Sequence, residues 1–222
     1  MKTTLFIDLD GTLLDVHARH YAVYATASQE LGFEPLTSDA YWQLRRTGKS
    51  SADALGDVPA DVIERFAVMW LDRIELDENL ALDQCYRGVL PVLERLSQRF
   101  RLALVTLRRD REALLRQLRS RRIYGYFSSV LSLTAYVRLS KADLVGQWAG
   151  PAIVIGDSEA DIELAEEMGA RCICLDWGLR SREFLRDVGA RAVVGSLDDL
   201  AARLEFVVEG EGEGDLESAA FP

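Results

Sequence analysis

Residues 5–12 read Leu-Phe-Ile-Asp-Leu-Asp-Gly-Thr, an apolar run that ends in two carboxylates one residue apart. A strand that is buried on both faces reads as a continuous apolar run, so we expect a central strand here with Asp8 and Asp10 at its carboxyl end. Ligands of open parallel α/β sheets bind at that edge. Two carboxylates this close repel each other unless a cation or a proton lies between them. Two solvated acids before a glycine turn would look the same, so the rest of the chain has to decide.

The composition indicates an acidic globular protein. Of 222 residues, 49% are hydrophobic and the formal net charge is −10, which suits one globular unit or a core with a smaller inserted domain. The chain lacks the basic footprint of a nucleic-acid-binding protein, and we expect no such partner. No apolar stretch approaches the length of a membrane span, and no signal segment precedes the first strand. The three cysteines form no CxxC pair and suit reduced thiols, so we predict a cytoplasmic location and no membrane partner.

The pattern along the chain changes twice. Between residues 15 and 86 apolar residues recur at helical spacing only, which indicates a helical insertion. After that, short apolar strands alternate with helices, as in a parallel sheet covered by helices on both faces. We predict a core of residues 1–14 and 87–205, the insertion at 15–86 and a disordered acidic tail at 206–222. The expected helices are 17–31, 38–48, 59–74, 91–98, 110–121, 141–148 and 160–168, and the expected strands 3–8, 101–106, 130–133, 152–155, 172–175 and 192–194.

Polar residues stand at the ends of several predicted strands. Thr106 ends one strand, Lys141 begins a helix, and Asp157 follows another strand. Because parallel strands end at one edge, these residues can converge on Asp8 and Asp10. Carboxylates suit Mg²⁺, to which Asp8, Asp157 and the backbone at Asp10 are candidate ligands. An aspartate freed from repulsion can attack a phosphoryl group, with Asp10 as acid and base. Taken singly, the same residues also suit a strand-end cap, a solvated lysine and an acidic first turn.

Together these motifs resemble the haloacid dehalogenase superfamily. Asp-Leu-Asp-Gly-Thr at 8–12, a strand ending in Thr106, then Lys141, then Gly-Asp-Ser-Glu-Ala-Asp at 156–161 resemble its four motifs in order. The resemblance extends over about residues 3–204. It implies a three-layer α/β Rossmann-like core with a mostly parallel sheet, and an inserted all-α cap like that of the phosphoglycolate phosphatase-like branch. It also implies magnesium-dependent phosphoryl transfer through an aspartyl-phosphate.

The resemblance assigns a role to each motif residue. Dehalogenase members lack the second aspartate, so Asp10 favours phosphate esters as substrates. Leu107 departs from the small or amide residues usual after the threonine, although its backbone N–H can still bind phosphate. The implied roles are nucleophile for Asp8, acid/base for Asp10, phosphate binding for Thr106, support of the nucleophile for Lys141, and magnesium binding for Asp157 with Asp161 supporting it. We predict substrate binding at Thr106 and Leu107, and a metal site formed from Asp8, Asp10, Asp157 and Asp161.

The helical insertion carries the candidates for substrate selection. Arg45, Arg46 and Lys49 lie in one short segment, and guanidinium groups recognise carboxylates and phosphates. We hypothesise that one of them contacts an anionic part of the substrate, although cations at a solvated helix end would look the same. The leading prediction is a magnesium-dependent phosphatase of a small phosphorylated metabolite. A phosphosugar mutase of the same superfamily and a non-enzymatic metal- or phosphate-binding protein are the alternatives.

Overall fold

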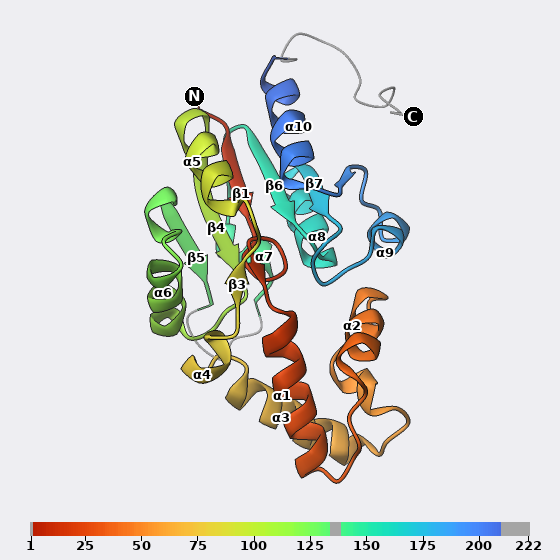
Figure 1. Cartoon of the computed structure of the whole chain (residues 1–222). Coiled ribbons are helices and arrows are strands. Elements are labelled where there is room, and N and C mark those ends of the chain that lie inside the picture. Colours follow the sequence, from red (N-terminus) through yellow and green to blue (C-terminus); the bar gives the residue numbers. More distant parts are fainter. Residues whose placement is uncertain (1, 134–138, 210–222) are drawn as a thin grey trace.

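A computed structural model of the chain describes residues 2–133 and 139–209. Its centre is a six-stranded sheet in the order β5-β4-β1-β6-β7-β8, in which every neighbouring pair is parallel (Figure 1). The first strand is central, as the sequence predicts. The strands of this sheet are β1 (Thr4–Ile7), β4 (Arg101–Thr106), β5 (Ser129–Ser132), β6 (Ala152–Gly156), β7 (Arg171–Leu175) and β8 (Val193–Val194).

Helices cover both faces of this sheet, because side chains along a strand alternate between the faces. Leu5 and Ile7 of β1 are buried in one hydrophobic cluster, whereas Phe6 is buried in another. The first cluster contains residues of α5, α6 and α10, and the second contains residues of α7 and α8. The three-layer α/β fold is therefore confirmed. The covering helices are α5 (Val89–Arg99), α6 (Arg111–Ser120), α7 (Lys141–Val145), α8 (Glu159–Met168) and α10 (Leu197–Glu209), with α9 (Arg182–Asp187) beside β8.

An all-α cap is inserted after the first strand, as predicted. The chain leaves the core through β2 (Leu14–Asp15) and returns through β3 (Gln84–Cys85), and these two short strands pair antiparallel. Between them, helices pack around Tyr24, Tyr41 and Phe66, beyond the ends of the core strands (Figure 1). The exact domain boundaries stay a prediction. The cap elements are α1 (His17–Glu30), α2 (Ser38–Arg46), η1 (Ala52–Leu55), α3 (Ala60–Arg73) and α4 (Asp77–Leu80); η2 (Tyr124–Tyr126) belongs to the core.

Local chemistry explains some helix ends and one of the shifted boundaries. The Thr37 hydroxyl accepts a hydrogen bond from a backbone N–H of α2, which is an N-cap contact. Pro59 stands just before α3 instead of at its first position. Helix α7 stops three residues short of the predicted end, because Gly146 turns the chain with φ of +64°. At the other end of the core, α10 continues to Glu209, past the predicted start of the tail at residue 206.

Two remaining expectations concern the ends of the chain and the membrane. Residues 210–222 of the predicted tail lie outside the described residues. Over residues 2–133 and 139–209, no helix combines the length and the apolar character needed to cross a membrane.

Candidate active site

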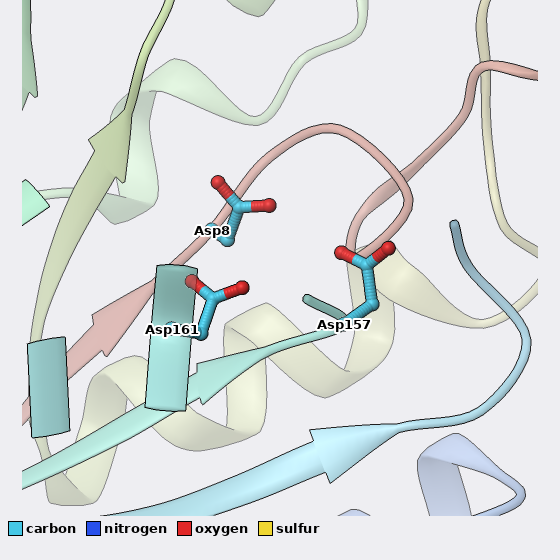
Figure 2. A group of neighbouring side chains, drawn as sticks. All are labelled: Asp8, Asp157 and Asp161. Atoms are coloured by element: carbon cyan, nitrogen blue, oxygen red, sulfur yellow. The ribbon is translucent and has the colours of Figure 1, made fainter. Parts of the chain in front are cut away.

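Three carboxylates meet at the carboxyl edge of the sheet. Asp8 follows β1, Asp157 follows β6, and Asp161 comes from the first turn of α8. Each offers an oxygen within 4.8 Å of the oxygens offered by the other two, and all three side chains are buried (Figure 2). The parallel register places the ends of β1 and β6 side by side, which is why residues nearly 150 positions apart come together.

Lys141 supplies a positive charge inside this cluster. Its Nζ lies 2.7 Å from Oδ1 of Asp8 and 2.6 Å from Oδ1 of Asp161, and the lysine side chain is 4% exposed. A capping box at Ser140 fixes the start of the short helix that carries the lysine. Burial alone would lower the pKa of Lys141, but Asp161 and Asp8 outweigh it and raise that pKa well above the usual range. The ammonium is therefore a permanent charge.

Asp157 is held by two donors from other segments. Its Oδ1 accepts a hydrogen bond from the Thr12 hydroxyl at 2.7 Å, and its Oδ2 accepts one from the backbone N–H of Leu179 at 2.6 Å. Gly11 allows this close approach, since a Cβ at residue 11 would lie 2.1 Å from Oδ2 of Asp157, and its φ of +82° favours glycine. Gly11 and Thr12 of the first motif thus make room for, and hydrogen-bond to, Asp157 of the fourth motif.

Burial makes ionisation of the acidic cluster costly. It is the largest influence on Asp8, whose pKa rises to about 7 even though Lys141 lowers it; Asp161 raises it further. Burial also raises the pKa of Asp157 well above its ordinary value, and the charges of Asp8 and Asp161 add to the effect. One lysine does not balance three carboxylates, so the cluster favours a further cation.

The donor set fits a magnesium ion. Mg²⁺ prefers oxygen ligands and is commonly bound through one or two protein carboxylates together with water and phosphate oxygens. Asp161 already accepts hydrogen bonds on both oxygens, from Lys141 and from Ser158. Asp157 likewise accepts on both oxygens, from Thr12 and Leu179, so the division in which Asp8 and Asp157 hold the metal and Asp161 supports them stays a prediction.

Asp10 pairs with two arginines, whereas the three clustered carboxylates share Lys141 or accept from neutral groups. Arg108 donates to both of its oxygens, from Nε at 2.5 Å and from Nη2 at 2.6 Å, and Nη2 of Arg19 lies 3.0 Å from Oδ1. Burial would raise the pKa of Asp10, but Arg108 and Arg19 outweigh it and hold that pKa far below its usual range. Both oxygens of this carboxylate thus face guanidiniums, and its predicted metal role stays a prediction. A contribution from the backbone of Asp10 stays a prediction.

The second motif lies at the end of β4, which pairs with β1. Thr106 is buried, and its hydroxyl accepts a hydrogen bond from the backbone N–H of Arg108 at 3.4 Å. Leu107 is 39% exposed. Their predicted contacts with phosphate stay predictions.

The three cations proposed for the cap have different surroundings. Arg46 donates to the backbone carbonyls of Asp176 and Gly178 at 2.6 and 2.7 Å, so it ties α2 to a core loop, a partner that the sequence did not indicate. Arg45 is buried and donates to the carbonyl of Lys49, whose own side chain is exposed. Contact of any of the three with substrate stays a prediction.

Sequence reasoning missed Arg19 and Arg108, which pair with Asp10, and Asp83, which pairs with both arginines. Arg19 reads as one residue of an amphipathic helix, and Asp83 carries no motif. Arg108 lies two residues after Thr106 and outside the four motifs. The side chains of all three are less than 5% exposed. A charged residue at a buried position of α1 was the available signal, since unpaired charges are rarely buried.

Comparisons with known proteins agree with this geometry. Residues 5–175 match the family model described as haloacid dehalogenase-like hydrolase. A phosphoglycolate phosphatase of Synechococcus elongatus is 24% identical over 83% of this chain and 88% of its own length. One of Aliivibrio fischeri is 26% identical over 81% and 86%. A haloacid dehalogenase-like hydrolase structure from Streptococcus pneumoniae superposes with a TM-score of 0.77 at 21% identity, over 91% of this chain and 98% of that one.

The chain belongs to the haloacid dehalogenase-like hydrolases, because the family model covers most of its length. The resemblance drawn from the motifs is thereby confirmed. The prediction of an enzyme, a phosphoric monoester hydrolase, agrees with the names of both curated relatives.

Proposed function

We propose that this hydrolase is a magnesium-dependent phosphatase of small phosphorylated metabolites that works through an aspartyl-phosphate on Asp8. The observation that carries the proposal is the pairing of Asp8 with Lys141 at 2.7 Å inside a buried group of three carboxylates. A structural ion pair does not require two further buried acids. A phosphoryl-transfer site does, because they hold the cation that accompanies a phosphate.

The nucleophile in this proposal is the oxygen of Asp8 that Lys141 leaves free. It attacks phosphorus, the bond from phosphorus to the ester oxygen breaks, and the phosphoryl group stays on Asp8. The leaving oxygen takes a proton from Asp10. Bound magnesium, held by Asp8 and Asp157, would supply charge neutralisation. Thr106 and the N–H of Leu107 would donate hydrogen bonds to phosphoryl oxygens.

Hydrolysis of the intermediate reverses the roles. Water attacks phosphorus and gives a proton to Asp10, the bond from phosphorus to Asp8 breaks, and inorganic phosphate leaves. Arg108 and Arg19 hold Asp10 as a carboxylate, the form that accepts this proton. The first step uses the protonated form of Asp10, which takes its proton from solvent and binds the two guanidiniums less tightly.

The cap would select the substrate and close over the core during turnover, which keeps bulk solvent out of the site. The names of the two curated relatives make 2-phosphoglycolate the first ester to test. Arg45 and Lys49 are the candidates for its carboxylate.

A panel of phosphate esters tests the proposal. The wild-type protein with Mg²⁺ should release inorganic phosphate from at least one ester, and Asp8→Asn should abolish release. Asp39→Asn, an exposed aspartate at the start of α2, is the matched control and should retain activity. Interconversion of sugar phosphates with slow phosphate release would favour the mutase instead. No turnover on the whole panel would favour a binding protein.

A further inference from the structure

A second buried charge network lies beside the acidic cluster, and Asp83 is its centre. Asp83 is fully buried between α4 and β3, on the segment by which the chain returns from the cap. Its Oδ1 accepts from Nε of Arg19 at 2.9 Å, and its Oδ2 accepts from Nε2 of Gln117 at 2.8 Å and Nη2 of Arg108 at 3.3 Å. Neither the motifs nor the chemistry proposed above uses this carboxylate.

The two arginines bound by Asp83 are the same two that hold Asp10. Arg19 spans the carboxylates with Nε on Asp83 and Nη2 on Asp10. Arg108 grips both oxygens of Asp10, and its Nη2 also faces Asp83. Two carboxylates and two guanidiniums thus form a closed ring in which the charges balance. A planar guanidinium fixed on one side has little freedom on the other, so Asp83 sets the position in which each arginine meets Asp10.

The members of the ring come from both parts of the fold. Arg19 lies on α1 of the cap, Arg108 lies on the core loop after β4, and Asp83 lies on the returning segment. Gln117 of α6 adds a bond to the carbonyl of Leu80, which fixes the returning segment to the core. A change in the orientation of the cap would therefore move Arg19 and, with it, the carboxylate of Asp10.

We propose that Asp83 is a positioning residue for Asp10, acting through Arg19 and Arg108, so that assembly of the cap on the core places the acid/base carboxylate. This inference rests on the proposed function, in which Asp10 exchanges protons with the leaving group and with water. Without the Asp83 charge, two guanidiniums compete for Asp10 alone and draw it out of place. Asp8 and Lys141, which touch neither arginine, keep their arrangement.

The test separates formation of the intermediate from its hydrolysis. p-Nitrophenyl phosphate has a leaving group that needs little help from an acid, so the first step depends weakly on Asp10, whereas hydrolysis by water needs the base. In Asp83→Asn we expect a burst of about one nitrophenolate per site, formed at a rate within about twofold of the wild type. Steady-state kcat should then fall about tenfold or more, with KM changed less than twofold.

Two further variants serve as a control and as a second test. Asp77→Asn removes an exposed partner of Arg116 close in sequence to Asp83 and should retain wild-type kcat. Gln117→Met removes a donor to Asp83 without changing any charge. Its kcat should fall about threefold with KM unchanged. This variant tests the positioning role of Asp83 if Asp83→Asn fails to fold. Folding is checked by circular dichroism.

Two kinds of failure remain distinguishable. No turnover by the wild type on any phosphate ester contradicts the proposed function and this inference with it. If the wild type turns over and folded Asp83→Asn has wild-type kcat, only the role of Asp83 is contradicted. A parallel fall of burst rate and steady-state rate also contradicts it, because a merely structural residue would affect both steps.

Discussion

Removing Lys141 should destabilise the folded protein strongly at neutral pH. Lys141→Met keeps most of the volume but leaves Asp8 and Asp161 without their shared cation. At an effective dielectric constant of about 20, unit charges separated by the 2.7 Å of the Lys141–Asp8 pair attract by roughly 6 kcal/mol. Dehydration of the lysine offsets part of this attraction, and removal of one partner of a buried pair costs about 3–5 kcal/mol. We expect a loss of that size in the free energy of unfolding at pH 7.5.

The pH dependence of this loss has a definite sign. The pKa of folded Asp8 is already about 7, against 3.8 for the ordinary side chain, and loss of Lys141 raises it further. A carboxyl group with a raised folded pKa destabilises the protein as pH rises through that pKa, and the cost disappears when the group is protonated. The loss should therefore be smaller at pH 5.5 than at pH 7.5.

Urea unfolding without added metal measures both values. Lys2→Met, at an exposed lysine that donates to the carbonyl of Gln98, is the control and should change the free energy by less than about 0.5 kcal/mol. A loss for Lys141→Met below about 1 kcal/mol at pH 7.5, or a larger loss at pH 5.5, would refute the view of Lys141 as the charge that stabilises the cluster.

Three further predictions follow from the same contacts. Gly11→Ala should lower stability by about 1–2 kcal/mol through its left-handed φ and weaken Mg²⁺ binding through its Cβ, which displaces Asp157; thermal unfolding and metal titration measure these effects. Burial, and next the nearby arginines, hold the pKa of His20 well below 6.5. The free energy of unfolding of the wild type should therefore fall below pH 6.5 by up to about 1.4 kcal/mol per pH unit relative to His20→Gln. If urea unfolding gave the two proteins the same dependence on pH, His20 would be solvated. Arg46→Met should speed proteolysis of the junction between cap and core, whereas exposed Lys49→Met should not.

Much of the fold could be predicted because its hydrophobic patterns are local. The buried strands β1, β4 and β6 were each predicted within one residue at either end, since continuous apolar runs mark them. The short strands β2 and β3 and the helices α4, α9 and α10 were not predicted. Segments of two to six residues carry little periodicity, and α10 begins close to the polar end of the chain.

Part of the candidate site could also be predicted from local patterns, and part could not. Asp8, Lys141, Asp157 and Asp161 meet because parallel strands end at one edge, and that convergence follows from the order of the motifs. The ring around Asp10 does not follow from any local pattern. Asp83 meets its partners from 25 to 64 positions away, and only the packed cap brings them together.

The central claim is that Asp8 carries the phosphoryl group during turnover. The direct measurement is acid quenching of the wild-type protein during steady-state turnover of its best phosphate ester with Mg²⁺, followed by peptide mass spectrometry. The account predicts that the peptide containing residues 5–12 gains the mass of one phosphoryl group, and that hydroxylamine removes it, as expected for an acyl-phosphate. Turnover with no modified peptide, or with the phosphoryl group on another residue, would contradict it.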